Sequence, residues 1–268
     1  MFEQALGPYV ILPWCMVAPA VCGAQDVLDP EPANVHAPCM LQAELVPYAP
    51  IREADVLWER RVWRVIDATD PINELLIAPS GSSEGCYGLL DIIKAGSLNE
   101  VSIVAYDPGP KGEDDHFEKP FDRDELRRLW ATLEAADGPK VTRYMIKEDW
   151  IFDKQRGEMQ VRIIGLAPMI EVLGEDGELR GHRPLLWLYY PECRLLFARW
   201  LAFVDRENEV SKSYEAVFGQ RRFTSTILKV SNGMDRGINA YSTGLDALLE
   251  GVGVRQQLLQ IGFDLWNH

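Results

Sequence analysis

The spacing of hydrophobic residues changes along the chain, and each change predicts a different element. From Glu53 to Ile66 the apolar positions recur every three or four residues, as on one face of a helix: Ala54, Trp58, Val62 and Val65. Acidic residues open this segment, arginines follow, and Pro71 closes it, which suits the helix dipole. We therefore predict that the folded part begins with a helix.

A short helix is predicted next, through Leu89, Leu90 and Ile93, with Ser82 or Ser83 as its N-cap and Gly96 as its end.

A predicted strand (101–106) and an acidic loop (107–120) lead into the best-marked helix of the chain. Asp122 and Glu125 have the spacing of a capping box. An i, i+3, i+4, i+7 apolar stripe follows and ends before Gly138: Leu126, Leu129, Trp130 and Leu133.

The middle of the chain alternates at a period of two, which is typical of strands. Residues 141–152 and 159–173 form two predicted strands, joined by a hairpin loop at 153–157. Asp176-Gly177 marks a second tight turn, and residues 185–190 supply a third strand. Together they predict an antiparallel meander.

Helical spacing returns after Pro191, with Tyr214, Val217 and Phe218 on one side. Residues 223–230 fit either a strand or a helix. The tail (245–266) is predicted to be a helix interrupted at Gly251 and Gly253. N-terminal helices, a central antiparallel meander and C-terminal helices predict an α+β fold, a single compact domain over residues 51–268.

The first 24 residues differ from the rest. Leu6 to Ala24 is almost wholly apolar and ends in small residues, which predicts a signal peptide at 1–24; its prolines disfavour a transmembrane helix. Because no basic residue precedes the apolar run, a buried N-terminal strand or arm of a cytosolic protein stays an alternative. A lipoprotein attached through Cys22 is a weaker one.

Residues 25–50 contain five prolines and scattered apolar residues, and we interpret them as a proline-rich extended arm. Such an arm is either a solvated tether or a strap that docks on a lipoprotein partner or a neighbouring copy.

The net charge disfavours some classes of partner, and the cysteine spacing disfavours a zinc site. The net charge of −14 disfavours nucleic acid and anionic membranes as partners, whereas 47% hydrophobic residues suffice for a core. Cys39, Cys86 and Cys193 would remain after cleavage, without zinc-ligand spacing. Buried free thiols are the preferred interpretation, with one disulfide as the alternative.

Candidate chemistry is sparse. Four scattered histidines (His36, His116, His182 and His268) lack metal-ligand spacing, and Asp114-Asp115-His116 reads as a solvated acidic loop. Neither a nucleophile elbow nor a nucleotide-binding loop occurs. We therefore predict no catalytic, cofactor-binding or metal-binding residues and no cofactor.

One cluster permits an alternative. Glu148, Asp149 and Asp153 surround Trp150, and paired carboxylates beside an aromatic ring are typical of glycosidases. On a strand, however, Glu148 and Asp149 point to opposite faces. A periplasmic carbohydrate-active enzyme, or a sugar- or peptide-binding module using surface tryptophans, is the alternative function.

Several of these segments resemble the GldN/PorN family of the type IX secretion and gliding-motility machinery. Residues 52–67 resemble its opening helix, and KEDWIFDKQRGEMQVRIIGLAPM (147–169) resembles its central hairpin. Further matches follow in order: LLWLYYPECR, RRFTSTILKVSN, GLDALLE and FDLW.

The resemblance implies a non-catalytic structural subunit of a periplasmic ring. It implies assembly with an outer-membrane lipoprotein of the PorK/GldK type, contact with the periplasmic part of a PorM/GldM-like subunit, and self-association within the ring. The expected location is the periplasm, at the inner face of the outer membrane, without a membrane span in the mature protein.

Overall fold

The computed structural model describes residues 45–77, 87–99, 102–135, 137–202, 212–231, 237–238 and 244–266. The predicted signal peptide and the arm up to residue 44 lie outside these residues. An antiparallel sheet with helices beside it confirms the predicted α+β class.

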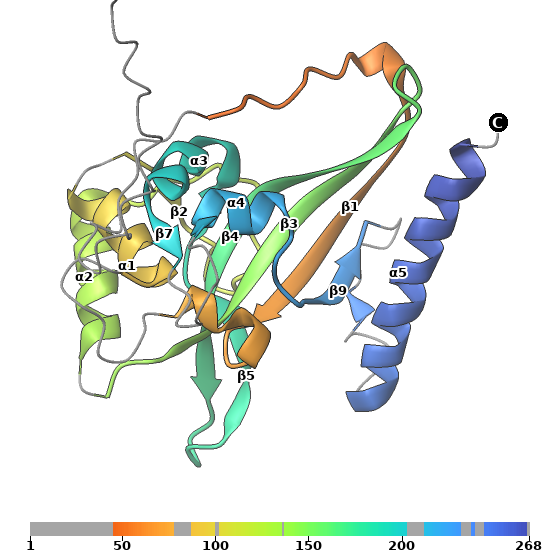
Figure 1. Ribbon diagram of the computed structural model, residues 1–268. Helices are drawn as coiled ribbons and strands as arrows, with labels where there is room; N and C mark the ends of the chain where they lie inside the picture. The colour runs from red at the N-terminus through yellow and green to blue at the C-terminus, as the bar shows by residue number, and fades with distance from the viewer. Residues whose placement is uncertain are drawn as a thin grey trace, which may run out of the picture. The chain divides into compact units, whose positions relative to one another are not determined.

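The sheet is built on the predicted hairpin, whose two long strands pair from the turn to Val141 and Ile170 (Figure 1). In the order in which strands lie side by side, the sheet contains β2 (Ala105–Tyr106), β6 (Trp187–Tyr189), β4 (Glu158–Leu173), β3 (Val141–Asp153), β1 (Val56–Asp67) and β9 (Thr226–Val230). The strand β5 (Leu179–Pro184), which the sequence analysis did not predict, also pairs with β4. Glycines with positive φ form both predicted turns, Gly157 at +65° and Gly177 at +77°.

The predicted opening helix is wrong, because residues 56–67 form strand β1. Only one 3₁₀ turn (Glu53–Asp55) precedes the strand. β1 is hydrogen-bonded on both edges, to β3 and to β9, and five consecutive residues from Val62 to Ile66 are buried. A helix with one apolar face cannot bury five residues in a row, whereas an inner strand covered on both faces does.

The helices lie mostly where the sequence places them. They are a 3₁₀ helix (Pro71–Leu76), α1 (Leu89–Lys94), α2 (Arg123–Glu134), α3 (Tyr190–Arg199), α4 (Tyr214–Gly219) and α5 (Gly244–Trp266). A short ribbon, β7 (Leu201–Ala202) with β8 (Lys212–Ser213), lies between α3 and α4 in the chain.

Both ends of α1 differ from the prediction. Gly88 is its N-cap, with its amide donating to Asp91, and Ser82 and Ser83 lie outside the described residues. Gly96 does not end the helix, because the chain continues into a π turn (Ala95–Asn99). A Cβ at Gly96 would lie 2.4 Å from Leu196 Cδ2, so this glycine serves close packing instead.

The capping box of α2 is confirmed. The Asp122 side chain accepts from the Arg123 amide at 2.7 Å, and the Glu125 side chain accepts from the Asp122 amide at 3.1 Å. Leu126 and Trp130 of its apolar stripe are buried in the main core.

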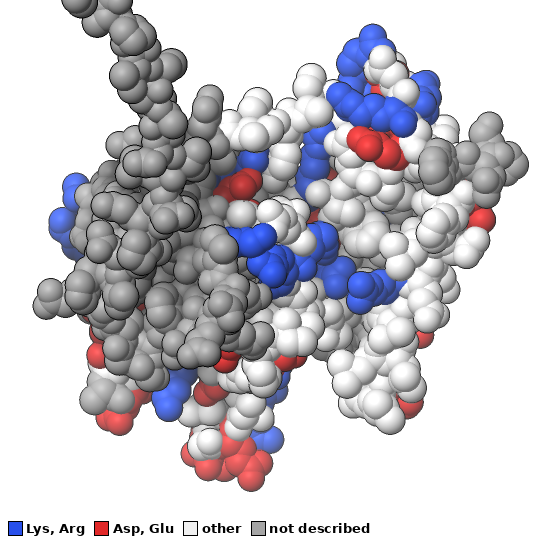
Figure 2. All heavy atoms as spheres, in the orientation of Figure 1, with Lys and Arg blue, Asp and Glu red and all other residues white. Residues whose placement is uncertain are grey.

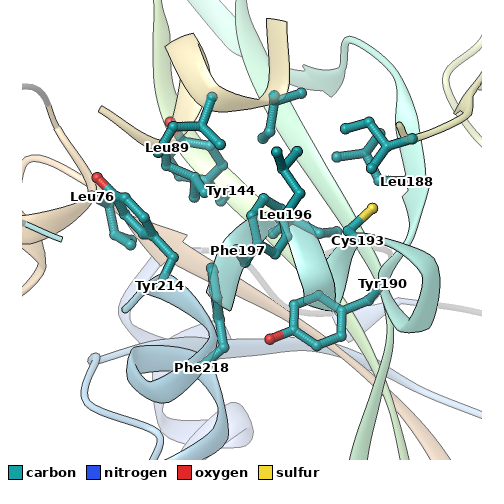
Figure 3. Close-up of a cluster of buried hydrophobic side chains, with 14 of the residues drawn as sticks. Leu76, Leu89, Tyr144, Leu188, Tyr190, Cys193, Leu196, Phe197, Tyr214 and Phe218 are labelled. Atoms are coloured by element: carbon teal, nitrogen blue, oxygen red, sulfur yellow. The ribbon is translucent and has the colours of Figure 1, made fainter. Parts of the chain in front are cut away.

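The main core lies where α1 to α4 pack against the sheet (Figure 3). Tyr190, Phe197 and Phe218 pack ring against ring, with centroids 5.6 to 6.1 Å apart. The Tyr214 hydroxyl donates to the carbonyls of Leu75 and Tyr87, which ties α4 to the segments around α1.

Helix α5 lies beside β9 and encloses a second, smaller core with Val62, Trp150 and Ile227 (Figure 1). β9 shows that residues 226–230 of the ambiguous segment at 223–230 are a strand. The predicted interruption at Gly251 and Gly253 is wrong, because α5 runs unbroken from Gly244 to Trp266.

Gly251 permits the close approach of α5 to β9. A Cβ at this position would lie 3.0 Å from the Ile227 carbonyl oxygen, whereas a Cβ at Gly253 would meet nothing within 4 Å. Gly253→Ala is expected to raise the free energy of unfolding by about 0.5–1 kcal/mol, because alanine favours a helix. Gly251→Ala is expected to lower it by about 1 kcal/mol, because α5 must move away from the strand. Urea denaturation of both variants checks this, and an equal gain for both would contradict the close approach.

Candidate interaction surface

The acidic cluster that suggested an enzyme is divided between the two faces of the sheet. Glu148 lies on the face that carries the second core, next to Trp150 in the same strand. Asp149 lies on the opposite face, opposite Arg61 of β1.

Glu148 is fully buried and belongs to an ion cluster. Its Oε1 lies 2.8 Å from Arg221 Nη1 as an ion pair without hydrogen-bond geometry, and its Oε2 accepts from Trp150 Nε1 at 3.0 Å. Arg64 completes the cluster and donates from Nε to Ser225 Oγ at 2.9 Å. Burial lowers the pKa of Arg64 to about 10, an effect that the nearby Glu148 carboxylate opposes.

The carboxylates of Asp149 and Asp153 also accept hydrogen bonds. Both Asp149 oxygens accept from the Arg61 guanidinium, at 2.7 and 2.9 Å, in a bidentate pair. Asp153 holds the hairpin turn by accepting from the Gln155 and Arg156 amides and from Arg156 Nη1.

Glycoside hydrolysis needs two carboxyl groups that converge on one bond, and Glu148 and Asp149 diverge. The tryptophans do not form a sugar platform either. Of those whose side chains the structure describes, Trp63, Trp130, Trp150 and Trp187 are buried, and Trp58 and Trp200 are partly buried. The geometry therefore gives the carbohydrate-active alternative no site among the described residues.

The acidic loop at 107–120 is solvated only in part: Glu113, His116 and Glu118 are exposed, whereas Asp115 docks on the sheet. Asp115 accepts from Trp63 Nε1 at 2.5 Å and pairs with Lys147 Nζ at 3.1 Å. Lys147 also donates to the Asp115 carbonyl at 2.7 Å and lies over the rings of Trp63 and Phe117. Burial lowers the pKa of Lys147, against the pull of Asp115.

Phe117 fixes the same loop from the side. It adopts a φ of +60°, and its ring packs edge-on against Tyr106, Trp187 and Tyr189. A Cβ at Gly165 of β4 would lie 2.8 Å from Phe117 Cζ, so glycine leaves room for the ring. The loop is thus a covering layer over the sheet, held by one buried ion pair and an aromatic cluster.

The remaining candidate residues that the structure describes lie apart from one another. His116 is exposed, and His182 lies within 3.4 Å of Thr142 and Arg143, with its pKa lowered by burial and by Arg143. Burial raises the pKa of the Cys193 thiol, which is free. No group of metal-ligating side chains gathers in the described part of the chain. His36, His268, Cys39 and Cys86 lie outside it.

The end of the predicted arm, residues 45–50, lies against the domain itself. The Tyr48 ring stacks on the Arg194 guanidinium at 3.9 Å, and Arg194 Nη2 donates to the Val46 carbonyl at 2.8 Å. Arg162 donates to the Ala49 carbonyl in the same way. These contacts anchor the arm where it enters the domain.

Exposed apolar side chains gather on the outer face of α5. Six apolar side chains on it are 48% to 69% exposed: Leu245, Leu248, Leu249, Val252, Leu259 and Phe263. Figure 2 shows that the surface over this helix is largely uncharged. Monomeric proteins rarely leave such a contiguous apolar strip open, which marks it as an interaction surface.

An apolar groove adjoins the C-terminal half of this strip. It has a volume of about 290 Å³ and lies between α5 and the β3–β4 hairpin, with Trp150, Met159, Leu258 and Phe263 in its lining. The helix and the groove together form one apolar surface.

Sequence reasoning did not identify this surface, although its signal is in the sequence. The tail is apolar on two sides, and the pattern cannot show which side packs inward. None of the helices in the described residues is long and apolar enough to cross a membrane.

Comparisons with known proteins identify the family of this chain. A search of curated proteins gives no match. The family model described as "Gliding motility associated protein GldN" matches residues 51–267, which is most of the chain. The segments that resembled the family lie inside this match, although its supposed opening helix is strand β1. The chain belongs to the GldN family of gliding-motility proteins, which is part of the type IX secretion and gliding-motility machinery.

Proposed function

We propose that this chain is a non-catalytic structural subunit of the periplasmic ring of the type IX secretion machinery. It assembles with a PorK/GldK-like outer-membrane lipoprotein, contacts a PorM/GldM-like subunit and associates with further copies of itself. Within this proposal, residues 1–24 are a signal peptide, residues 25–50 an arm, and residues 51–268 the assembling domain.

The observation that carries the structural role is the exposed apolar face of α5. A subunit that works by assembly needs surface that stays unfavourably exposed until its partner binds. The buried acids support the same view, because ion pairs to Arg61 and Arg221 occupy the carboxylates that an enzyme would need free. The family match supplies the machinery to which such a subunit belongs.

The test is purification of the tagged chain from the native cell envelope, followed by mass spectrometry. We expect a lipoprotein of the PorK/GldK type at near-equal amounts and a PorM/GldM-like protein at lower amounts. The purified chain should begin near Gln25. An unrelated periplasmic protein with the same tag is the control. Recovery of the chain from the cytoplasm with Met1 intact, without the lipoprotein, would contradict the proposal.

A further inference from the structure

Helix α5 carries a heptad seam on its outer face. Six positions follow one another at alternating distances of four and three residues: Leu245, Leu249, Val252, Gln256, Leu259 and Phe263. This spacing keeps them in one line along a helix, as the a and d positions of a coiled coil do. All six are exposed, and we call them the α5 seam.

The seam is distinct from the face by which α5 packs on its own domain. Ala247 and Leu258 point inward and belong to the second core, with Val254 partly buried against it. Gly251 lies against the Ile227 carbonyl on this same inner side. The domain therefore uses one apolar face of α5 and leaves the seam open.

We propose that the α5 seam binds the α5 seam of a second copy of this chain, in a parallel two-fold pair. The area supports a pair of copies. The six exposed apolar side chains of α5 present roughly 600 Å² per copy, so a pair that covered them fully would bury about 1,200 Å², the lower end of the range for specific interfaces. A two-fold contact uses the same patch on both copies, so one seam is a sufficient interface.

Gln256 determines the direction of the pair. In a parallel arrangement, equivalent a positions face each other, and the two Gln256 amides can hydrogen-bond across the axis. In an antiparallel arrangement each Gln256 would face Val252 of the second copy, and a buried amide without a partner is costly. A single polar residue at an a position is a known device for fixing the register of a coiled coil.

The residues beside the seam do not oppose this pairing, although the chain carries a net charge of −14. The flanking positions on one side are Asp246, Gly253 and Gln260, and those on the other are Leu248, Arg255 and Gly262. In a parallel pair, Arg255 lies near Gln260 of the second copy, so that like charges are not brought together.

Cysteine cross-linking tests the direction of the pair. In a chain in which Cys15, Cys22, Cys39 and Cys86 are serine, Val252→Cys is expected to form an intermolecular disulfide on mild oxidation, because equivalent d positions face each other in a parallel pair while Gln256 stays in place. Gln257→Cys, exposed on the same helix and away from the seam, is the matched control and should stay largely uncross-linked. Equal cross-linking of both variants would overturn the parallel pair.

Sedimentation of the purified chain alone tests the pair itself. We expect the wild-type mass to be twice that of one chain at micromolar concentration, and Leu249→Glu or Leu259→Glu to weaken self-association about 100-fold or more. Gln257→Glu adds the same charge off the seam and should still dimerise, and circular dichroism should show all of these variants folded.

A wild-type chain that stays monomeric at tens of micromolar would overturn the inference. The inference would also be overturned if the chain were monomeric and Leu249→Glu abolished its binding to a different protein, because the seam would then be the binding site for that protein. Sedimentation uses the purified chain alone, so a monomeric result would not contradict the proposed ring role. Likewise, copurification without the ring partners would not contradict the pair.

Discussion

Replacing Asp115 with asparagine is expected to lower the free energy of unfolding by about 3 kcal/mol. The Lys147 side chain is only 3% exposed, and Asp115 provides the carboxylate that pairs with it. Asparagine keeps an oxygen for Trp63 Nε1 but removes the negative charge. The buried ammonium group then loses its ion-pair partner and keeps only the hydrogen bond to the carbonyl of residue 115 and the weaker attraction of Asp149. The loop at 107–120 should therefore leave the sheet easily.

Urea denaturation measures the loss of stability, and limited proteolysis within residues 107–120 measures release of the loop. Asp114→Asn is the matched control, because Asp114 accepts only a local hydrogen bond from the His116 amide, and a loss below about 0.5 kcal/mol is expected. Adding Lys147→Met to Asp115→Asn should restore part of the stability, since an apolar side chain needs no counter-ion. Equal small losses for Asp114 and Asp115 variants would show that the loop is not held by this pair.

Glu148→Gln is expected to cost about 3 kcal/mol of folding free energy, because it removes the carboxylate that faces Arg64 and Arg221 inside the protein. Asp149→Asn is the neighbouring control. It breaks a pair whose arginine side chain is 39% exposed, so water can replace much of the interaction and a cost of about 1 kcal/mol is expected.

Thermal and urea unfolding of the two variants measure this difference, and copurification with the envelope partners follows at a temperature where both are folded. Assembly and secretion should then be unaffected. A catalytic carboxylate behaves in the opposite way, since its replacement often raises stability while it abolishes function. A stable Glu148→Gln variant that assembles but does not support secretion would favour the alternative, an enzyme, over the non-catalytic role.

Several features follow from the sequence because they are local. The capping box of α2 joins residues three positions apart, and the β3–β4 hairpin needs only a period of two around a glycine turn. The divergence of Glu148 and Asp149 was also predictable, since neighbouring residues on a strand point to opposite faces. The ion pairs that occupy Glu148 and Asp149 were not predictable, because Arg221 and Arg61 are distant in the chain.

Residues 53–66 show how tertiary structure overrides a local pattern. Their apolar residues fit a helical face, yet strands β3 and β9 provide hydrogen-bond partners on both edges, and three clusters of packed side chains cover the two faces. An isolated segment has neither partner, so its own spacing could not reveal the strand.

The sequence by itself determined the α+β class, the hairpin at 141–173, the helix at 123–134 and the family, because these depend on local spacing and on short matched segments. Only the tertiary structure decided that residues 56–67 are a strand, that the acidic loop covers the sheet, and that α5 is continuous with one apolar face left open. Each of these depends on which distant segment packs against which face, and the periodicity of one segment contains no information about its neighbours.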